Sequence, residues 1–286
     1  MTQLVCAVTG ANGYIGKQIV NALRHQGCIV YELGRFLKNA QNPQYFLSYQ
    51  LDQLELPDLK NCDALIHCAY DFDVKTLKKS KEINVDGSVR LFQHAQSCGV
   101  KKIILISSLS AFEGARSIYG KTKLALEKQA AQYGAIIIRP GLVFGANTRG
   151  IVGAMKKFVK KFPIVPLIGM GGQKFYACYI ENLCELIIFL ITSNTLLQNP
   201  MIAAHKQPIT FREIVLLLAK SENKNIRMLP IPFLIILAGL KILEAANINI
   251  GLRSDSLVGA QYYDKNPDFS GLDTPVTFPP FQSELI

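Results

Sequence analysis

No two cysteines in this 286-residue sequence form a CxxC pair, and the number of cysteines, seven, is odd. This argues against a disulfide scaffold and indicates a reduced, cytoplasmic protein. We also expect no signal peptide, because the apolar run at residues 4–8 reads as the first strand itself, and no internal repeat or low-complexity tract occurs. A chain of this length with 49% apolar residues predicts one large domain, or one domain with a smaller cap.

A nucleic-acid-binding module is missing as well, although the formal net charge is +10. The basic residues are spread along the chain, and a basic cleft for an anionic cofactor and substrate explains them equally well. We therefore expect neither nucleic acid nor a metal ion as a partner. One cluster, Lys156, Lys157, Lys160 and Lys161, lies on a predicted helix whose other face is apolar. It favours a solvated face, with a diphosphate or a membrane surface as alternative contacts.

Three glycines follow the first apolar run in the pattern Gly10-Ala-Asn-Gly13-Tyr-Ile-Gly16. Gly10 permits a sharp turn, Gly13 lets the backbone approach a pyrophosphate, and Gly16 lets the next helix pack against the strand. Apolar residues then recur at helical spacing until Gly27, which predicts the end of that helix. The free N–H groups at the start of the helix favour a diphosphate. The pattern predicts a dinucleotide site.

The second predicted strand, residues 28–33, is followed by Gly34 and Arg35 instead of a carboxylate. An NAD-selective site uses a carboxylate there to bind the ribose hydroxyls. Without it, Arg35 can form a forked, charge-assisted pair with a 2′-phosphate, and Lys38 can assist. This favours NADP as the cofactor. NAD is the alternative, if Arg35 only stacks on the adenine.

Strands and helices alternate over the first 140 residues or so. Further strands are predicted at residues 45–49, 64–67, 102–106 and 135–138, and helices at 74–98 and 119–133. This alternation predicts the α/β class, with a Rossmann-type doubly wound parallel sheet. Ligands of such sheets bind outside the carboxyl ends of the strands. The segments of interest fall there: Gly10, Arg35, Ala69, Ser107–Ser110 and Arg139–Gly141.

The segment Tyr119-Gly-Lys-Thr-Lys123 places a phenol and an ammonium one helical turn apart, on the same face of a predicted helix. A phenol beside a nicotinamide can move a proton while a hydride is transferred. Together with the glycine pattern, in this order and on these elements, the pair predicts an oxidoreductase site.

These motifs resemble an extended or atypical short-chain dehydrogenase/reductase of the NAD-dependent epimerase/dehydratase family, over roughly residues 3–260. The resemblance also rests on Asp63-Ala-Leu-Ile-His67-Cys-Ala69, on Asn84-Val-Asp-Gly87, on residues 99–108, and on Arg139-Pro140-Gly141-Leu-Val-Phe-Gly145.

The resemblance implies a catalytic set of Ser108, Tyr119 and Lys123. Tyr119 would donate or accept the proton, and Ser108 would hydrogen-bond the reacting oxygen, with Ser110 as the alternative. Lys123 would hydrogen-bond the nicotinamide ribose and lower the pKa of the phenol through its charge.

The resemblance also implies cofactor contacts along the sheet edge and a homodimer built from the helices at 74–98 and 119–133. The expected dimer contacts are Val85, Val89, Phe92, Leu124 and Ala131. The expected cofactor contacts are Gly10, Asn12, Gly13, Tyr14, Ile15, Gly16, Arg35, Gln50, Leu51, Cys68, Ala69, Tyr70, Asn84, Ser107, Tyr119, Lys123, Pro140, Gly141, Leu142 and Val143.

Two departures from the family narrow the activity. Leu109 and Ser110 stand where the family's 4,6-dehydratases carry acidic residues, and only ten residues separate Ser108 from Tyr119. We expect a 4-ketoreductase or a 4-epimerase that acts on a carbinol or keto carbon of a nucleotide-linked sugar, and not a 4,6-dehydratase. The alternatives are an NADP-binding accessory protein with little turnover, similar to the nucleotide-binding subunit of respiratory complex I, and a reductase of a lipid-like ketone.

The C-terminal part is less regular. We expect residues 1–165 to form mainly the dinucleotide-binding domain and residues 166–286 mainly a small substrate cap, interleaved in one compact unit. Helices are predicted at 183–191 and at 210–220, the latter with Thr210 as its N-cap. The apolar stretch 229–240 is too short to span a bilayer and predicts a cap or core helix, with a membrane-surface contact as the alternative.

Overall fold

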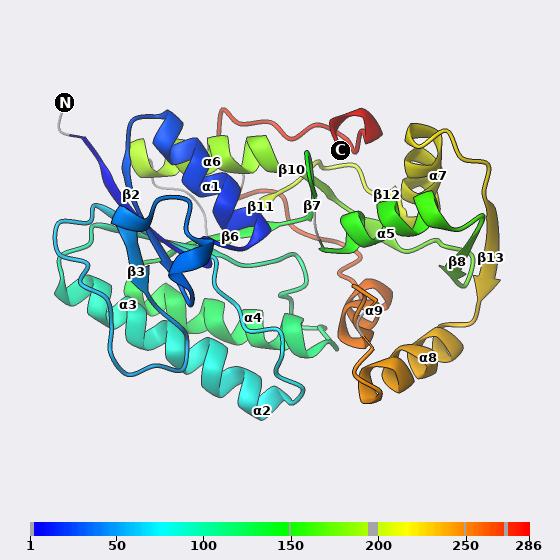
Figure 1. Ribbon diagram of the computed structural model, residues 1–286, viewed down its shortest axis with the longest axis horizontal. Helices are drawn as coiled ribbons and strands as arrows, with labels where there is room; N and C mark the ends of the chain where they lie inside the picture. The colour runs from blue at the N-terminus through cyan, green and yellow to red at the C-terminus, as the bar shows by residue number, and fades with distance from the viewer. Residues whose placement is uncertain (1–2, 149, 194–199, 249, 272–273) are drawn as a thin grey trace.

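The computed structural model describes residues 3–148, 150–193, 200–248, 250–271 and 274–286. Its centre is a sheet of seven parallel strands in the order β11-β6-β5-β4-β1-β2-β3 (Figure 1). The strands are β1 (Val5–Thr9), β2 (Ile29–Gly34), β3 (Phe46–Ser48), β4 (Ala64–His67), β5 (Lys102–Ile106), β6 (Ile136–Pro140) and β11 (Met201–Ala203). The chain builds outward from β1 to β3, returns to β4 on the other side of β1 and continues to β11. The predicted doubly wound sheet is confirmed, with its switch point between β1 and β4.

The central strands are apolar because helices cover both faces of the sheet. One face packs against α1 (Tyr14–His25) and α6 (Ile180–Thr192), and the other against α3 (Gly87–Ser97) and α4 (Ile118–Ala130) (Figure 1). Every residue of β4 is buried. Since β11 and α6 come from beyond residue 165, the C-terminal part of the chain completes this sheet and its cover.

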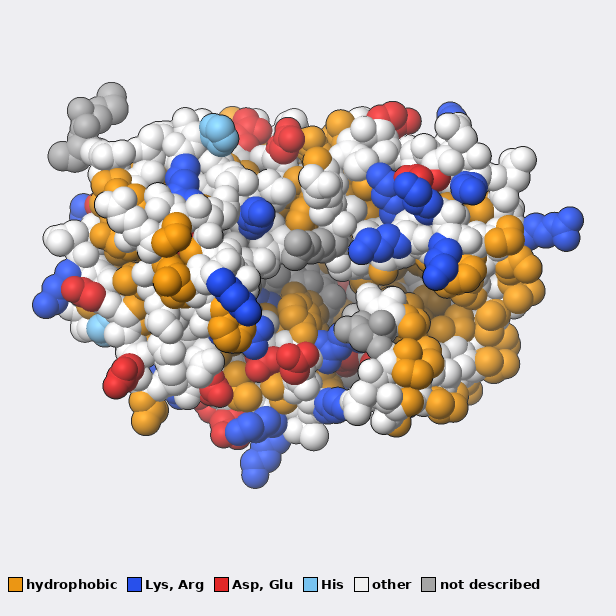
Figure 2. All heavy atoms as spheres, viewed as in Figure 1, with side chains coloured by type: hydrophobic (Ala, Val, Ile, Leu, Met, Phe, Trp, Pro, Cys, Tyr) orange, Lys and Arg blue, Asp and Glu red, His pale blue; other side chains and the backbone are white. Residues whose placement is uncertain are grey.

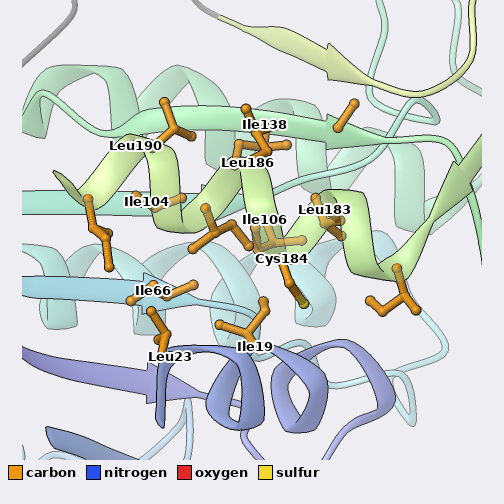
Figure 3. Packing of buried hydrophobic residues seen from close by; sticks show 14 of the residues in the cluster. Ile19, Leu23, Ile66, Ile104, Ile106, Ile138, Leu183, Cys184, Leu186 and Leu190 are labelled. Atoms are coloured by element: carbon orange, nitrogen blue, oxygen red, sulfur yellow. The ribbon is translucent and has the colours of Figure 1, made fainter. Parts of the chain in front are cut away.

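Figure 3 shows how the first of these layers packs. Ile19 and Leu23 of α1 lie beside Ile66 of β4, while Leu186 of α6 lies beside Ile138 of β6. The helical spacing of the apolar residues in α1 therefore predicted its buried face correctly. The helix ends as expected, because Gly27 adopts a positive φ of 78° and its N–H donates to the Arg24 carbonyl.

The region 74–98 is helical, but it starts later than predicted and is not uniform. α2 (Leu77–Ser80) begins after Thr76, whose hydroxyl accepts a hydrogen bond from the Lys79 N–H. Residues 81–86 then form a π-helical segment that continues into α3. The sequence analysis did not predict this segment, which carries Asn84 into the neighbourhood of the site.

Two of the expected dimer contacts are wrong. Val85 and Phe92 are buried in the core of their own chain, where Phe92, on the sheet side of α3, meets the His67 ring edge-on. Their side chains are therefore not available to a second copy in this conformation. Val89 and Leu124 are half-buried and Ala131 is exposed, so these three remain available at the surface.

The second part of the molecule consists of short paired strands and four helices. β7 (Leu142–Phe144) pairs with β10 (Ala177–Tyr179), β9 (Lys174–Phe175) with β12 (Ile209–Thr210), and β8 (Ile164–Ile168) with β13 (Arg227–Ile231). The helices are α5 (Gly150–Lys161), α7 (Phe211–Ser221), α8 (Phe233–Ala245) and α9 (Ser254–Gln261). The predicted N-cap of α7 is confirmed, because the Thr210 hydroxyl accepts from the Glu213 N–H in a full capping box.

The apolar stretch 229–240 forms the predicted cap or core helix only in part. Its first three residues belong to β13, and α8 begins only after Pro232 and runs beyond Lys241 to Ala245. Pro230 is tolerated because β13 pairs with β8 alone and forms a sheet edge. α8 lies at the rim of the molecule (Figure 1) and buries only Leu240. In the part of the chain that the structure describes, no helix combines the length and the apolar character needed to cross a bilayer.

Candidate active site

The glycine-rich turn lies at the switch point of the sheet and has the geometry that its sequence predicts. Gly10 has a positive φ of 63°, and a Cβ atom there would lie 2.9 Å from the Ala69 nitrogen. A Cβ atom on Gly16 would lie 2.3 Å from the Gly10 carbonyl oxygen, so α1 can approach the turn only because this residue is glycine. The Gly13 N–H donates to the same carbonyl at 2.9 Å.

The residues at this turn fit a dinucleotide. α1 starts at Tyr14, its N-cap Gly13 offers no side chain, and its first turn holds no acidic residue. The first N–H groups of a helix have no partner within the helix and favour an anion. The amide oxygen of Asn12 is buried and lacks a hydrogen-bond partner among the described residues. This orphaned acceptor can receive a hydrogen bond from a ligand hydroxyl.

The end of β2 lacks a free carboxylate, as the sequence predicts. A Cβ atom on Gly34 would lie 2.8 Å from the Asn12 amide nitrogen, so a side chain there would require the Asn12 side chain to move. The nearest acid of β2, Glu32, is buried and paired with Arg24 at 2.8 Å. Arg35 is exposed, with its guanidinium 5.9 Å from the centre of the Phe36 ring. Among the described residues just after β2, the exposed charge is therefore the positive charge of Arg35.

A buried hydrogen-bond chain centred on His67 links β1, β4 and the π-helical segment. The N–H groups of residues 68 and 69 donate to the Thr9 hydroxyl, which lies 2.9 Å from His67 Nδ1. His67 Nε2 lies 2.8 Å from the Ser88 hydroxyl, which donates to the Asn84 carbonyl at 2.6 Å. One set of hydroxyl orientations satisfies every group in this chain if the neutral imidazole carries its proton on Nε2. The sequence analysis quoted His67 only as part of a motif and missed this role.

The side chain of Asn84 holds the loop after β4. Its amide oxygen accepts from the Asp71 N–H at 2.6 Å, and its amide nitrogen donates to the Asp71 carbonyl at 3.2 Å. The Tyr70 hydroxyl lies 3.1 Å from the Ser80 hydroxyl and fixes the same loop. These bonds engage the side chains of Asn84 and Tyr70, both expected cofactor contacts, in positioning the loop.

The loop covers Tyr119, which lies in the first turn of α4. The Phe72 ring stacks on the Tyr119 ring at 5.5 Å and 22°, and the Tyr70 ring meets it edge-on at 4.9 Å. The Ser108 side chain acts to lower the pKa of the phenol against the effect of burial, and its hydroxyl accepts the Ser110 N–H at 3.1 Å. Between the two candidate serines, the structure places Ser108 at the phenol.

Lys123 is buried one turn further along α4, where a backbone carbonyl holds its ammonium. Its ammonium donates to the Ile106 carbonyl at 2.8 Å and lies 6.0 Å from the centre of the Tyr119 ring. Burial lowers the pKa of Lys123 to about 8. Burial also raises the pKa of Tyr119, and the group that lowers it is Ser108. The Lys123 ammonium is thus aimed at the end of β5, and its expected effect on the pKa of the phenol stays a prediction.

The other expected cofactor contacts differ in their burial and in the contacts that their side chains make. The Ser107 hydroxyl donates to Glu127, which is paired with Arg139 at 2.6 Å, so it serves the contact between α4 and the sheet. Leu51 is buried and Gln50 is exposed. Five further expected contacts are half-buried: Tyr14, Ile15, Cys68, Ala69 and Val143.

A cavity of about 330 Å³ joins the catalytic candidates to the cap. Its sheet side is lined by Ser108, Ser110, Tyr119 and residues 140–142, all predicted from the sequence. Its other walls come from the loop after β4, from β9 and from α9, and include Phe72, Lys174, Phe175, Tyr176, Arg253 and Asp255. The sequence could not reveal these walls, since residues from separate segments of the chain come together there only in the folded structure.

Asp255 fixes the start of α4 from the cap. Its two carboxylate oxygens accept the N–H groups of Ile118, at 2.7 Å, and Tyr119, at 3.0 Å.

A second cavity, of about 590 Å³, lies on the other side of Phe72 and Tyr119, between the loop after β4 and α8–α9. In the described ranges, no group of three or more His, Cys, Asp or Glu side chains could hold a metal ion.

Comparison with known proteins finds a matching family and similar proteins. Residues 6–202 match the model of the NAD dependent epimerase/dehydratase family. UDP-glucose 4-epimerase from Vibrio cholerae is 25% identical over 258 residues, which cover 79% of this chain and 78% of that protein. Ceramide reductase from Caulobacter vibrioides is 26% identical over 201 residues, 66% of this chain but only 61% of that protein. The solved UDP-glucose 4-epimerase of Thermus thermophilus in complex with NAD superposes with a TM-score of 0.67 at 20% identity, over 80% of this chain and 86% of that one, and shows the same fold.

Proposed function

Because this chain belongs to the NAD-dependent epimerase/dehydratase family, we propose that it transfers a hydride to or from a carbinol or keto carbon of a nucleotide-linked sugar. The observation that carries the proposal is that Ser108 and Tyr119 both line the cavity that joins the sheet edge to the cap. Residues 1–165 then supply mainly the dinucleotide site, and residues 166–286 mainly the substrate cap.

The reaction needs a proton at the oxygen whose carbon gains or loses the hydride. Tyr119 holds that proton, and Ser108 orients the reacting oxygen toward it by a hydrogen bond. Because Phe72 and Tyr70 cover the phenol, they keep bulk water from competing for the proton. A bound nicotinamide supplies the hydride chemistry. Lys123, with a pKa of about 8, stays mostly protonated at neutral pH and can hold the neighbouring ribose.

The cofactor we propose is NADP, with NAD as the alternative. Arg35 is exposed at the end of β2, and Glu32 is engaged with Arg24, so no carboxylate repels a 2′-phosphate. A reductase consumes its reduced cofactor, whereas an epimerase recycles it, so this feature favours a 4-ketoreductase over a 4-epimerase. Leu109 and Ser110 give the site no acid in the positions that a 4,6-dehydratase would use.

The substrate cavity suits a sugar linked to a diphosphate. Lys174 and Arg253 line it and can pair with phosphate oxygens. The aromatic walls, Phe72, Phe175 and Tyr176, can cover the apolar faces of a sugar ring or a base. UDP-glucose, the substrate named for the Vibrio relative, is the first candidate to test. We also propose a homodimer in the cytoplasm.

The experiment is a search for the substrate in two stages. Small molecules released from the purified protein are identified by mass spectrometry, and a panel of nucleotide sugars and their 4-keto derivatives is then assayed with NADPH and NADH. Turnover of one panel member supports the proposal. Tight NADPH binding with no turnover would favour an accessory protein instead, and turnover confined to a ceramide-like ketone would favour the lipid reductase.

A further inference from the structure

The helix α8 is almost entirely apolar, yet most of it is not covered. Leu234, Ile235 and Ile242 are 72%, 62% and 69% exposed, and Leu240 is its single buried residue. A helix that is apolar on all sides is normally buried. The outer side of α8 is therefore a surface for which the described residues provide no cover.

This apolar surface continues onto the neighbouring edge. Leu229 of β13 and Ile164 of β8 are each 52% exposed, and they project from two strands that pair in parallel. Figure 2 shows hydrophobic side chains along the rim where β13 and α8 lie in Figure 1. We call these five residues, Leu234, Ile235, Ile242, Leu229 and Ile164, the α8 face.

The end of α5 adds aromatic rings and positive charge beside the α8 face. Phe158 and Phe162 pair at 4.6 Å, and both are partly exposed. Lys157 and Lys161 are exposed and form no ion pair with any described residue. In Figure 2, Lys and Arg side chains gather over α5, next to the apolar rim.

Acidic groups near this surface are already engaged. Glu222 pairs with Lys156 at 3.6 Å and with Lys160 at 3.7 Å, which leaves the other two lysines of the cluster uncompensated. Glu244, at the end of α8, accepts from the N–H and the hydroxyl of Ser254, both at 2.7 Å. The surface therefore combines exposed aliphatic side chains with net positive charge.

We propose that the α8 face and the lysines of α5 dock onto an anionic membrane surface. Aliphatic and aromatic side chains beside lysines match the two layers of such a surface, the acyl boundary and the negatively charged headgroups. The charge complementarity selects a bilayer over a second copy of this chain, because a second copy would bring the same positive charge to the contact. The inference does not depend on the proposed activity.

Docking in this orientation would place a cavity next to the lipid. The second cavity is lined by Leu237 and Lys241 of α8 and reaches Phe72 and Tyr119 at its inner end. The helix that contacts the membrane is thus also a wall of the space beside the candidate catalytic tyrosine.

The test is co-sedimentation of the full chain with two kinds of vesicle, one of phosphatidylcholine alone and one of phosphatidylcholine with an equal amount of phosphatidylglycerol. We expect binding to the anionic vesicles that is weakened by salt, and weaker binding to the neutral ones. Leu234→Gln, Ile235→Gln and Ile242→Gln combined should weaken binding by at least about tenfold. Lys157→Gln with Lys161→Gln should weaken binding to anionic vesicles by about tenfold or more, and should leave binding to neutral vesicles unchanged.

Matched controls separate this surface from general stickiness. Leu54→Gln removes an exposed leucine that does not belong to the α8 face, and Lys78→Gln with Lys121→Gln removes two exposed lysines of α2 and α4. Both should bind like the wild type. If the triple variant loses its thermal unfolding transition, Ile242→Gln alone carries the test. The proposal is overturned if the wild type binds neither vesicle, if the α8 variants bind as well as the controls, or if the triple variant disrupts a homodimer while the wild type ignores anionic vesicles.

Discussion

At the scale of single residues, the site depends on where each polar group is engaged. Ser108 lies with Tyr119 in the lining of the cavity, while the hydroxyl of the neighbouring Ser107 donates to Glu127. The sequence named both serines, but adjacent residues at a strand end point in different directions, and only coordinates tell which one reaches the cavity. The sequence likewise predicted Lys123 one helical turn from Tyr119, but it could not show that the buried ammonium donates to the Ile106 carbonyl. The predicted effect of Lys123 on the pKa of the phenol stays a prediction.

Arg35 tests the cofactor preference. NADPH should bind at least several-fold more tightly than NADH, because a forked, charge-assisted contact is typically worth about 1.5–3 kcal/mol. Arg35→Ala should remove most of that difference, and Lys38→Ala should remove less. Dissociation constants from fluorescence titration decide the matter, and equal values for the two cofactors in the wild type would refute the preference.

His67 should make the protein less stable in mild acid. Burial lowers its pKa in the folded state from 6.5 to about 3. Between these values the unfolded chain binds a proton that the folded protein does not, so the free energy of unfolding falls as the pH falls. Between about pH 7.5 and about pH 5.5 this residue should cost roughly 1.4 kcal/mol. Urea titrations at both pH values measure it. His67→Gln should lose this component, whereas His25→Gln, an exposed control, should keep it.

At the scale of elements, the parts specified by local sequence were predicted well, and the parts specified by distant contacts were not. β1, the glycine turn and α1 follow from buried apolar residues and from glycines that no other residue can replace at this spacing. The stretch 229–240 was predicted as one cap or core helix, whereas Pro230 lies in an edge strand and α8 begins only after Pro232. The sequence could not predict the walls of the cavity, because α9 and α4 are far apart in the chain and come together only in the folded structure.

Asp255 should stabilise the start of α4 from a distance. Asp255→Ala leaves the N–H groups of Ile118 and Tyr119 without their acceptor and should lower the free energy of unfolding by about 1–3 kcal/mol. Asp255→Asn keeps one amide oxygen and should lose less. Urea unfolding of the three proteins checks the order, and equal midpoints would mean that α4 does not depend on this contact.

At the scale of the whole molecule, assembly remains a prediction. The helices that would pair in a homodimer keep Val89, Leu124 and Ala131 at the surface, although Val85 and Phe92 are buried. We expect light scattering to give the mass of a dimer at a concentration on the order of tens of micromolar. Leu124→Lys should shift the protein toward the monomer, because it places a charge in the apolar contact. A monomeric wild type at that concentration would exclude this arrangement.

The whole account rests on Tyr119 as the group that moves the proton, and Tyr119→Phe tests it most directly. The substitution removes the hydroxyl and keeps the ring between Phe72 and Tyr70. With the substrate found by the panel, kcat should fall by at least about a hundredfold, as for loss of a general acid–base group, while the cofactor dissociation constant stays within a few-fold. Ser108→Ala should also lower kcat, and Ser110→Ala should change it little. If Tyr119→Phe keeps full activity, Tyr119 is not the proton donor or acceptor, and the mechanism is wrong.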